Sequence, residues 1–428
     1  MADDAPARLL DRALRAGATH AEVYHVQSRS RPVAFEANRL KQLESSESTG
    51  TVLRVWRDDR PGTAVACGPS EQDWLVERAL ALARLNEPEP ADLAVGTPLE
   101  FPSVGTPTPL EAQIEQGREA IAIVRDAYPE VICSSEWDCE WHTTRLLNST
   151  GLDCQYAETL LSGSLGVEWI RGDDFLAVDY GQQSRDCLDA EAIARAILQR
   201  LDWAATNVAP PTGRVPVAFG AGAAPLLWDT VEAALDGKRV RERSSPWSDA
   251  SGTKVVAAGI TVTQEPACGP ASCPVDDEGT LTQVLTPIDN GRLQQFYCDR
   301  ATGRALGCAS TGNGFRPGLG RSPTPQLVNF IVAPGRGRLV DLARQLGDGL
   351  FIDRVLGGGA DISGDFSVNI DLGYRIAGGE IVGRVKDTMV AGNVYSALEN
   401  LIAIGEDGEW SGSCYTPSLA VAGLSVVG

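Results

Sequence analysis

The chain has 428 residues, of which 43% are hydrophobic and 22% charged, and its formal net charge is −20 at pH 7. This length predicts two or three domains, and the balance of apolar and charged residues is typical of a globular protein. Because an acidic surface repels phosphates, we expect no nucleic acid among its partners.

The first 88 residues are predicted to form an N-terminal α+β domain. Their first residues include acidic ones, whereas a secretory signal begins with positively charged residues that are followed by an apolar run. Leucines at positions 9, 10 and 14 predict a helix over residues 5–16. Strands are predicted over 20–27 and 50–59, and a second amphipathic helix over 71–86.

A Pro- and Gly-rich linker is predicted over 89–109, followed by a central α+β domain over 110–208 with helices at 110–127 and 189–202. Residues 209–428 are rich in glycine and predict a mainly antiparallel β domain. The expected class is therefore α+β. No segment reaches the roughly 20 apolar residues of a membrane helix. With ten cysteines, none in a Cys-x-x-Cys pair, we expect a cytoplasmic protein and no membrane contact.

Several local patterns favour structure over chemistry. His20 and His25 lie on a predicted strand whose alternation places them on opposite faces, which argues against a shared metal. The same reasoning separates Cys139 from His142 in "CSSEWDCEWH". The segment "CGPASCPVDDEG" (268–279) matches neither a zinc nor a calcium pattern and is interpreted as a variable surface loop.

The segment "VAFGAGAAP" (217–225) is a strand followed by a Gly-x-Gly turn, and it lacks the third glycine of a dinucleotide site because Pro225 takes that place. We interpret it as a tight turn leading into the amphipathic helix "APLLWDTVEAALDG" (224–237). No Gly-x-Ser-x-Gly elbow occurs, and only three histidines are present. The residues alone reveal no catalytic centre.

Three C-terminal segments resemble the TldD/PmbA family in order and spacing. They are "STGNGFRPGLGRSPTPQLVNFIV" (310–332), "GDFSVNIDLGYRIAGGEIVGRVKDTMVAGNVYSALENLIAIGED" (364–407) and "GSCYTPSLAVAGLSVVG" (412–428). The N-terminal run "RALRAGATHAEVYHVQ" is similar to the first domain of that family. The resemblance implies a metallopeptidase-like fold with a TldD-type zinc subunit and a TldE (PmbA)-type subunit that lacks the zinc helix.

In the TldD type, the resemblance implies a His-Glu-x-x-x-His helix and a further cysteine ligand near the C-terminus. Laid on this chain, the first histidine falls on Trp228, the glutamate on Asp229 and the second histidine on Ala233. Indole and methyl groups cannot ligate zinc, so we expect no catalytic residue and no metal in this chain. Cys414 is interpreted as a possible relic of the cysteine ligand.

The resemblance implies that this chain is a non-catalytic subunit, paired with a TldD-type partner that carries the zinc. The pair would enclose a cavity and process peptides, either modified peptide natural products or unstructured polypeptides. Backbone pairing at a sheet edge can hold such a peptide. The expected peptide-binding residues are the loop Ser310, Thr311, Gly312 and Asn313 and the strand Phe366, Ser367, Val368, Asn369 and Ile370.

Two alternatives remain open. The chain could be a stand-alone peptide-binding or scaffold homodimer without proteolytic activity. It could also be a self-sufficient hydrolase whose centre uses acids such as Asp229 and Glu232 in place of zinc.

Overall fold

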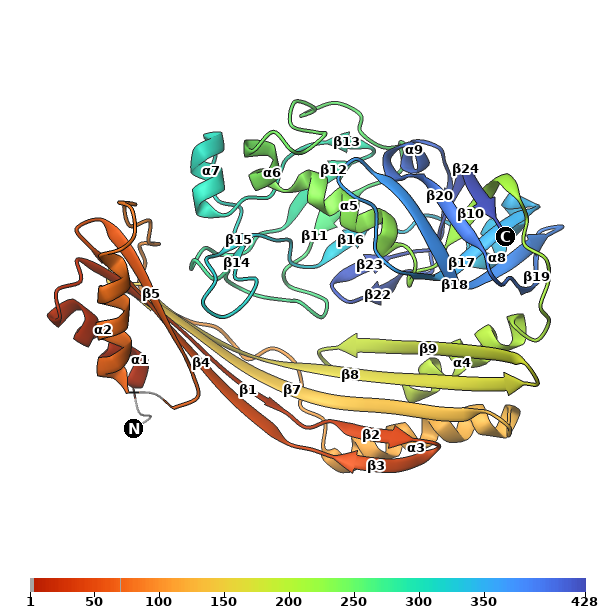
Figure 1. Ribbon diagram of the computed structural model, residues 1–428, viewed down its shortest axis with the longest axis horizontal. Helices are drawn as coiled ribbons and strands as arrows, with labels where there is room; N and C mark the ends of the chain where they lie inside the picture. Colours follow the sequence, from red (N-terminus) through yellow and green to blue (C-terminus); the bar gives the residue numbers. More distant parts are fainter. Residues whose placement is uncertain (1–3, 70) are drawn as a thin grey trace.

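The computed structural model describes residues 4–69 and 71–428, which form nine helices and four β-sheets (Figure 1). The helices are α1 Ala5–Arg15, α2 Gln72–Ala83, α3 Leu110–Ala127, α4 Ala190–Trp203, α5 Pro225–Leu235, α6 Gly237–Arg241, α7 Arg300–Leu306, α8 Leu339–Leu346 and α9 Val394–Glu399. The combination of these helices with mostly antiparallel strands confirms the predicted α+β class. None of the helices in this part of the chain is both long enough and apolar enough to cross a membrane.

The largest sheet has nine strands and lies along the base of the molecule in Figure 1. Its strands are β1 His20–Ser30, β2 Val33–Glu36, β3 Arg39–Leu43, β4 Ser46–Arg57, β5 Arg60–Cys67, β6 Pro98–Glu100, β7 Ile132–Asn148, β8 Asp153–Arg171 and β9 Asp174–Ser184. Both β1 and β2 pair with β7, so the strands of residues 1–88 and 110–208 share one sheet. The division of this region into two domains therefore stays a prediction. Within the predicted linker, β6 pairs with β8.

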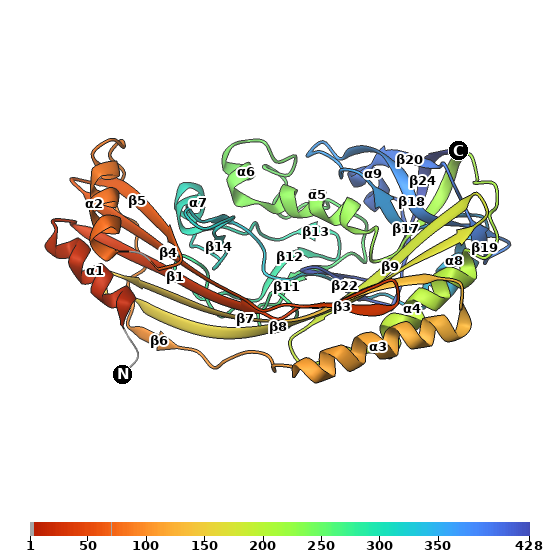
Figure 2. The same cartoon turned by 60° about the horizontal axis from the view of Figure 1, so that its bottom comes forward.

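The alternation predicted for residues 133–142 is present in β7, where Trp137 and Cys139 are buried. The alternation ends at Trp141, which is 38% exposed. The Trp137 face packs with β8 against α3 and α4, which cover this face of the sheet (Figure 2).

The C-terminal half contains three sheets. A seven-stranded sheet is built from β10 Gly213–Phe219, β17 Gly349–Leu356, β18 Asp365–Ala377, β19 Glu380–Arg384, β20 Met389–Asn393, β21 Leu401–Ile404 and β24 Leu419–Val427. A six-stranded sheet is built from β11 Val262–Gln264, β12 Leu285–Asp289, β13 Arg292–Leu293, β16 Phe330–Val332, β22 Glu409–Ser411 and β23 Cys414–Thr416. A small pair consists of β14 Gly314–Phe315 and β15 Thr324–Pro325. Only β10–β17 and β16–β23 pair in parallel among the described strands of these sheets.

The interpretation of residues 268–279 as a variable surface loop is wrong. Asp276 and Asp277 are 2% and 7% exposed. Asp276 accepts hydrogen bonds from the backbone N–H groups of Gly314, Glu278 and Thr280. The loop is buried because its carboxylates satisfy backbone donors, a role that spacing rules for metal ligands do not detect.

Arg316, whose backbone N–H donates to Asp277 of this loop, joins the two halves of the molecule. The Arg316 guanidinium lies 2.8 Å from the Glu22 carboxylate of β1, and the two side chains are only 4% and 6% exposed. Arg316 also lies over the ring of Tyr24, 4.9 Å from its centroid. The N-terminal sheet is thus attached to the C-terminal half through a buried ion pair.

Candidate functional site

Helix α5 follows the glycine-rich turn after β10, as the sequence predicts. Pro225 occupies its first turn, where a missing N–H has no cost. Leu227, Val231 and Leu235 recur at helical spacing and are fully buried. Gly222 is required in the turn because a Cβ there would lie 2.7 Å from the carbonyl oxygen of Asp353.

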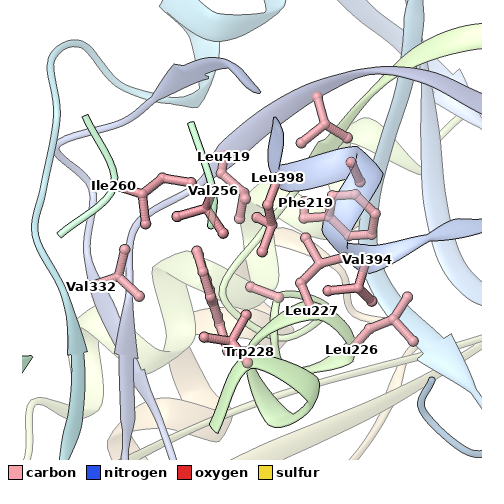
Figure 3. Close-up of a cluster of buried hydrophobic side chains, with 14 of the residues drawn as sticks. Phe219, Leu226, Leu227, Trp228, Val256, Ile260, Val332, Val394, Leu398 and Leu419 are labelled. Atoms are coloured by element: carbon pink, nitrogen blue, oxygen red, sulfur yellow. The ribbon is translucent and has the colours of Figure 1, made fainter. Parts of the chain in front are cut away.

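Trp228 fills the centre of the core between α5 and the two larger C-terminal sheets. Its side chain is 1% exposed and lies among apolar side chains that include Val256, Ile260 and Val332 (Figure 3). The indole Nε1 donates a hydrogen bond of 2.8 Å to the hydroxyl of Thr416 in β23. The ring centroid lies 5.9 Å from that of Phe330. The indole therefore occupies this space with its single polar atom satisfied.

Glu232 follows Trp228 by one turn of α5, and both Glu232 and Asp229 lie close enough to Cys414 of β23 to interact with it electrostatically. Burial raises the pKa of Glu232 to about 7, and the neighbouring Asp229 adds to this effect. Burial also raises the pKa of the Cys414 thiol, which is therefore protonated at neutral pH. Ala233, on the same helix, brings only a methyl group.

These side chains do not fit a catalytic zinc ion. Trp228 and Ala233 have no lone pair to donate, and catalytic zinc needs three protein ligands. Across residues 4–69 and 71–428, no three His, Cys, Asp or Glu side chains converge in a way that could hold a metal. Asp229, Glu232 and Cys414 are therefore close together but are not arranged as ligands of a metal ion.

The loop Ser310–Asn313 is largely internal. Asn313 is fully buried and its amide donates to Gln264 Oε1 and to the backbone oxygen of Gln326, each at 2.7 Å. The Thr311 hydroxyl donates to Asn313 Oδ1 at 2.6 Å. Gly312, with a φ of 73°, lies against the backbone of Leu281. Of the four residues, Ser310 and Thr311 keep partial exposure.

The strand segment from Phe366 to Ile370 lies in β18 and pairs with β20 along one side. On its other side β17 ends at Leu356, which is opposite Asn369. The Phe366 and Val368 side chains are buried, whereas Ser367 and Asn369 are exposed. No described strand continues beside Phe366–Val368 on the β17 side, so this short stretch of backbone forms a sheet edge.

A cavity of about 470 Å³ lies between the two halves of the molecule, and sequence reasoning missed it. One wall is β9, the edge strand of the nine-stranded sheet, and the other is β22, the edge strand of the six-stranded sheet. The turn Ala221–Gly222 before α5 also lines it. A second cavity of about 280 Å³ shares Arg200, Ala221, Asp353 and Glu409 with the first. We call the larger cavity the β9–β22 groove.

The backbone of β9 is open toward this groove. The carbonyl oxygens of Phe175 and Ala177 accept hydrogen bonds from Arg384 and Arg354 of the C-terminal half, so they point away from β8. In an antiparallel ladder alternate residues point the same way. The backbone groups of Asp179, Gly181 and Gln183 therefore face the groove. No pattern in the sequence identifies this edge, because it depends on which strand ends the sheet.

Comparison with known proteins identifies the family. Residues 212–428 match the PmbA/TldA metallopeptidase C-terminal domain, and residues 21–83 match PmbA/TldA metallopeptidase domain 1. The chain belongs to the PmbA/TldD family. This confirms the resemblance seen in the C-terminal segments.

Among relatives of this PmbA/TldD-family chain, the metalloprotease PmbA homolog of Haemophilus influenzae is 26% identical, with 97% of this chain and 94% of the relative covered. The metalloprotease TldD homolog of Buchnera aphidicola is 30% identical over 46% of this chain and 41% of the relative. Thus the chain matches less than half the length of that TldD relative. The crystal structure of TldE from Thermococcus kodakarensis is similar in fold, with a TM-score of 0.90, 22% identity and 99% of each chain covered.

Proposed function

We propose that this chain is a TldE (PmbA)-type, non-catalytic subunit of a zinc metallopeptidase complex that processes peptides. The observation that carries the proposal is Trp228, whose indole fills the core where the family resemblance would place a zinc histidine. Restoring a metal there would require removing a buried side chain of α5. The full-length similarity to a PmbA homolog supports the same assignment.

In this proposal the zinc and the catalytic glutamate belong to a TldD-type partner, with which the chain forms a heterodimer or higher heteromer. The chain helps to enclose the cavity and guides peptide to it. The open edges at Phe366–Val368 and along β9 support a role in holding extended peptide, since backbone pairing tolerates varied side chains. Ser310 and Thr311 stay proposed contacts, while the buried Asn313 and Gly312 would act by shaping their loop. The cytoplasmic location and the lack of nucleic-acid binding stay predictions from the sequence.

The test is co-expression of the chain with a TldD-type protein, followed by metal analysis and peptide hydrolysis assays on each subunit and on the mixture. We expect the two proteins to co-purify, zinc to be present in the partner only, and hydrolysis to require the partner. Stoichiometric zinc in the purified chain alone, or hydrolysis by it, would overturn the proposal. Failure to co-purify, together with a stable homodimer, would favour the scaffold alternative.

One observation favours the self-sufficient hydrolase as a second candidate. A carboxyl group with a pKa of about 7, as at Glu232, is suited to proton transfer near neutral pH. The adjacent Cys414 thiol has a raised pKa and is therefore a poor nucleophile, which weighs against this candidate. Peptide hydrolysis by the isolated chain that is lost in Asp229→Asn and in Glu232→Gln would support it.

A further inference from the structure

The charges that line the β9–β22 groove are unevenly compensated. Its wall carries four carboxylates and two guanidinium groups, those of Glu136, Asp179, Asp353, Glu409, Arg200 and Arg354. Both arginines are already engaged within the protein. Arg200 forms a bidentate salt bridge with Asp353, with N–O distances of 2.8 and 2.9 Å. Arg354 is shared between Asp179 and Asp371.

The other two carboxylates in the groove, Glu136 and Glu409, are not paired in this way. No salt bridge in the described part of the chain reaches Glu136 or Glu409. Glu409 is the more deeply placed of the two, and its carboxylate accepts a hydrogen bond from the Tyr180 hydroxyl. Burial raises the pKa of Glu409, and the charge of Arg200 opposes this effect. Asp353 and Asp407 also act on Glu409, and both raise its pKa. A carboxylate that is removed from water and lacks a full counter-charge is stabilised by an incoming cation.

The floor of the groove has room for a long side chain. Glu136, Ser164 and Gly181 lie side by side across β7, β8 and β9, on the face turned away from α3 and α4. Ser162 lies on the neighbouring row of β8. The two serines and Gly181 are small and leave the space next to the open β9 edge unfilled, while Glu409 lies beside Tyr180 of β9.

We propose that the β9–β22 groove selects peptides with a lysine or arginine side chain, whose cation pairs with Glu409, while the peptide backbone lies along the edge of β9. This inference rests on the proposed peptide-handling function and adds a charge preference to it. An ammonium or guanidinium group donates directly to the Glu409 carboxylate, and the Tyr180 hydroxyl bond to that carboxylate can be kept.

The experiment measures binding of the full chain to unstructured fluorescent peptides of equal length that differ only at one central residue, which is lysine, glutamine or glutamate. A charged hydrogen bond in a partly buried site predicts that the lysine peptide binds about tenfold more tightly than the glutamine peptide. Glu409→Gln is expected to abolish this difference between the lysine and the glutamine peptide. The control is Glu119→Gln, an exposed residue of α3 that changes the net charge equally without lining the groove.

Backbone pairing is tested separately. Gln183→Pro removes a backbone N–H that faces the groove and leaves the β8 ladder intact, whereas Gln183→Ala keeps that N–H. We expect only the proline variant to weaken all three peptides to a similar degree.

The outcomes separate the inference from the function on which it rests. Equal affinity for all three peptides overturns the charge preference and leaves peptide binding standing. A lysine preference that survives in Glu409→Gln, or is lost equally in Glu119→Gln, attributes it to the overall acidic surface and also overturns the inference. Binding of none of the peptides overturns peptide binding by this chain and, with it, the inference.

Discussion

The indole Nε1 of Trp228 and the hydroxyl oxygen of Thr416 lie 2.8 Å apart, although 188 positions separate them in the chain. This bond joins α5 to β23 at the centre of the C-terminal core. Thr416 is itself fully buried and donates its hydroxyl proton to the carbonyl oxygen of Pro417. The space next to α5 is thus closed by a specific pair of side chains.

Trp228→Ala is expected to lower the free energy of unfolding by about 3–5 kcal/mol, because it leaves a large cavity in a packed core. Trp228→Phe keeps most of the volume and loses the bond to Thr416, so a loss of about 1–3 kcal/mol is expected. Urea unfolding followed by circular dichroism measures both. Trp74→Phe, at a side chain that is 51% exposed, is the control and should change stability by less than about 0.5 kcal/mol. Equal effects at Trp74 and Trp228 would contradict this account.

Removal of divalent metal should leave the melting temperature unchanged. A metal that binds only the folded state raises stability in proportion to its occupancy, and the residues next to α5 do not fit one. The measurement is thermal unfolding of the purified chain with a chelator and with added zinc. A fall in melting temperature on chelation, reversed by zinc, would show that the chain holds a structural or catalytic ion.

The stability of the fold should fall as pH rises from about 4.5 toward 8, through the contribution of Glu278. Burial raises the pKa of this carboxyl from 4.5 to about 8, and its neighbours Asp276 and Asp299 add to the shift. Across this window the folded state holds a proton that the unfolded state has released, so a higher pH favours unfolding. Glu278→Gln keeps an acceptor for the backbone N–H of Arg300 and removes the titration. Urea unfolding near both ends of the window should therefore show a smaller pH effect in this variant than in the wild type, and an undiminished effect would exclude Glu278 as its source. The control, Glu119→Gln, should leave the pH effect unchanged.

Breaking the buried pair between Glu22 and Arg316 should loosen the attachment of the N-terminal sheet. Glu22→Gln removes the closest carboxylate of a guanidinium that is only 4% exposed and leaves it the buried Asp277 as its neighbouring acid, so a loss of up to about 3 kcal/mol in unfolding free energy is expected. Glu47→Gln breaks an exposed pair with Arg29 and should cost no more than about 1 kcal/mol. The double variant Glu22→Leu with Arg316→Met should lose less stability than Glu22→Gln, because both charges of the pair are removed and the remaining buried acid, Asp277, whose pKa burial raises, can take up a proton. A double variant that is less stable than Glu22→Gln would show that the pair contributes more than the cost of burying its charges.

Local patterns predicted the elements well because each depends on neighbouring residues. The five helices expected from leucine spacing, turn residues and composition are α1 to α5, and the ends of α3 agree with the prediction at residues 110 and 127. The burial of Trp137 and Cys139 follows from period-two alternation, which is also a local property. The replacement of a zinc histidine by Trp228 is a proposal that the sequence alone supports, since the identity of the residue decides whether it can ligate.

The features that decide the site depend on contacts between distant segments. Residues 268–279 were expected at the surface because they match neither a zinc nor a calcium pattern, yet the tertiary fold brings the N–H of Gly314 and the Tyr24 hydroxyl to Asp276 and Asp277. The β9–β22 groove exists because two sheets end opposite one another, and no residue pattern marks the last strand of a sheet. The sequence likewise shows that a tryptophan stands at position 228. Its hydrogen-bond partner Thr416 is known only from the fold, in which β23 packs against α5. The sequence therefore determines which side chains can ligate a metal or form a helix. Which strand edges stay open and which charges pair is decided by packing between segments far apart in the chain.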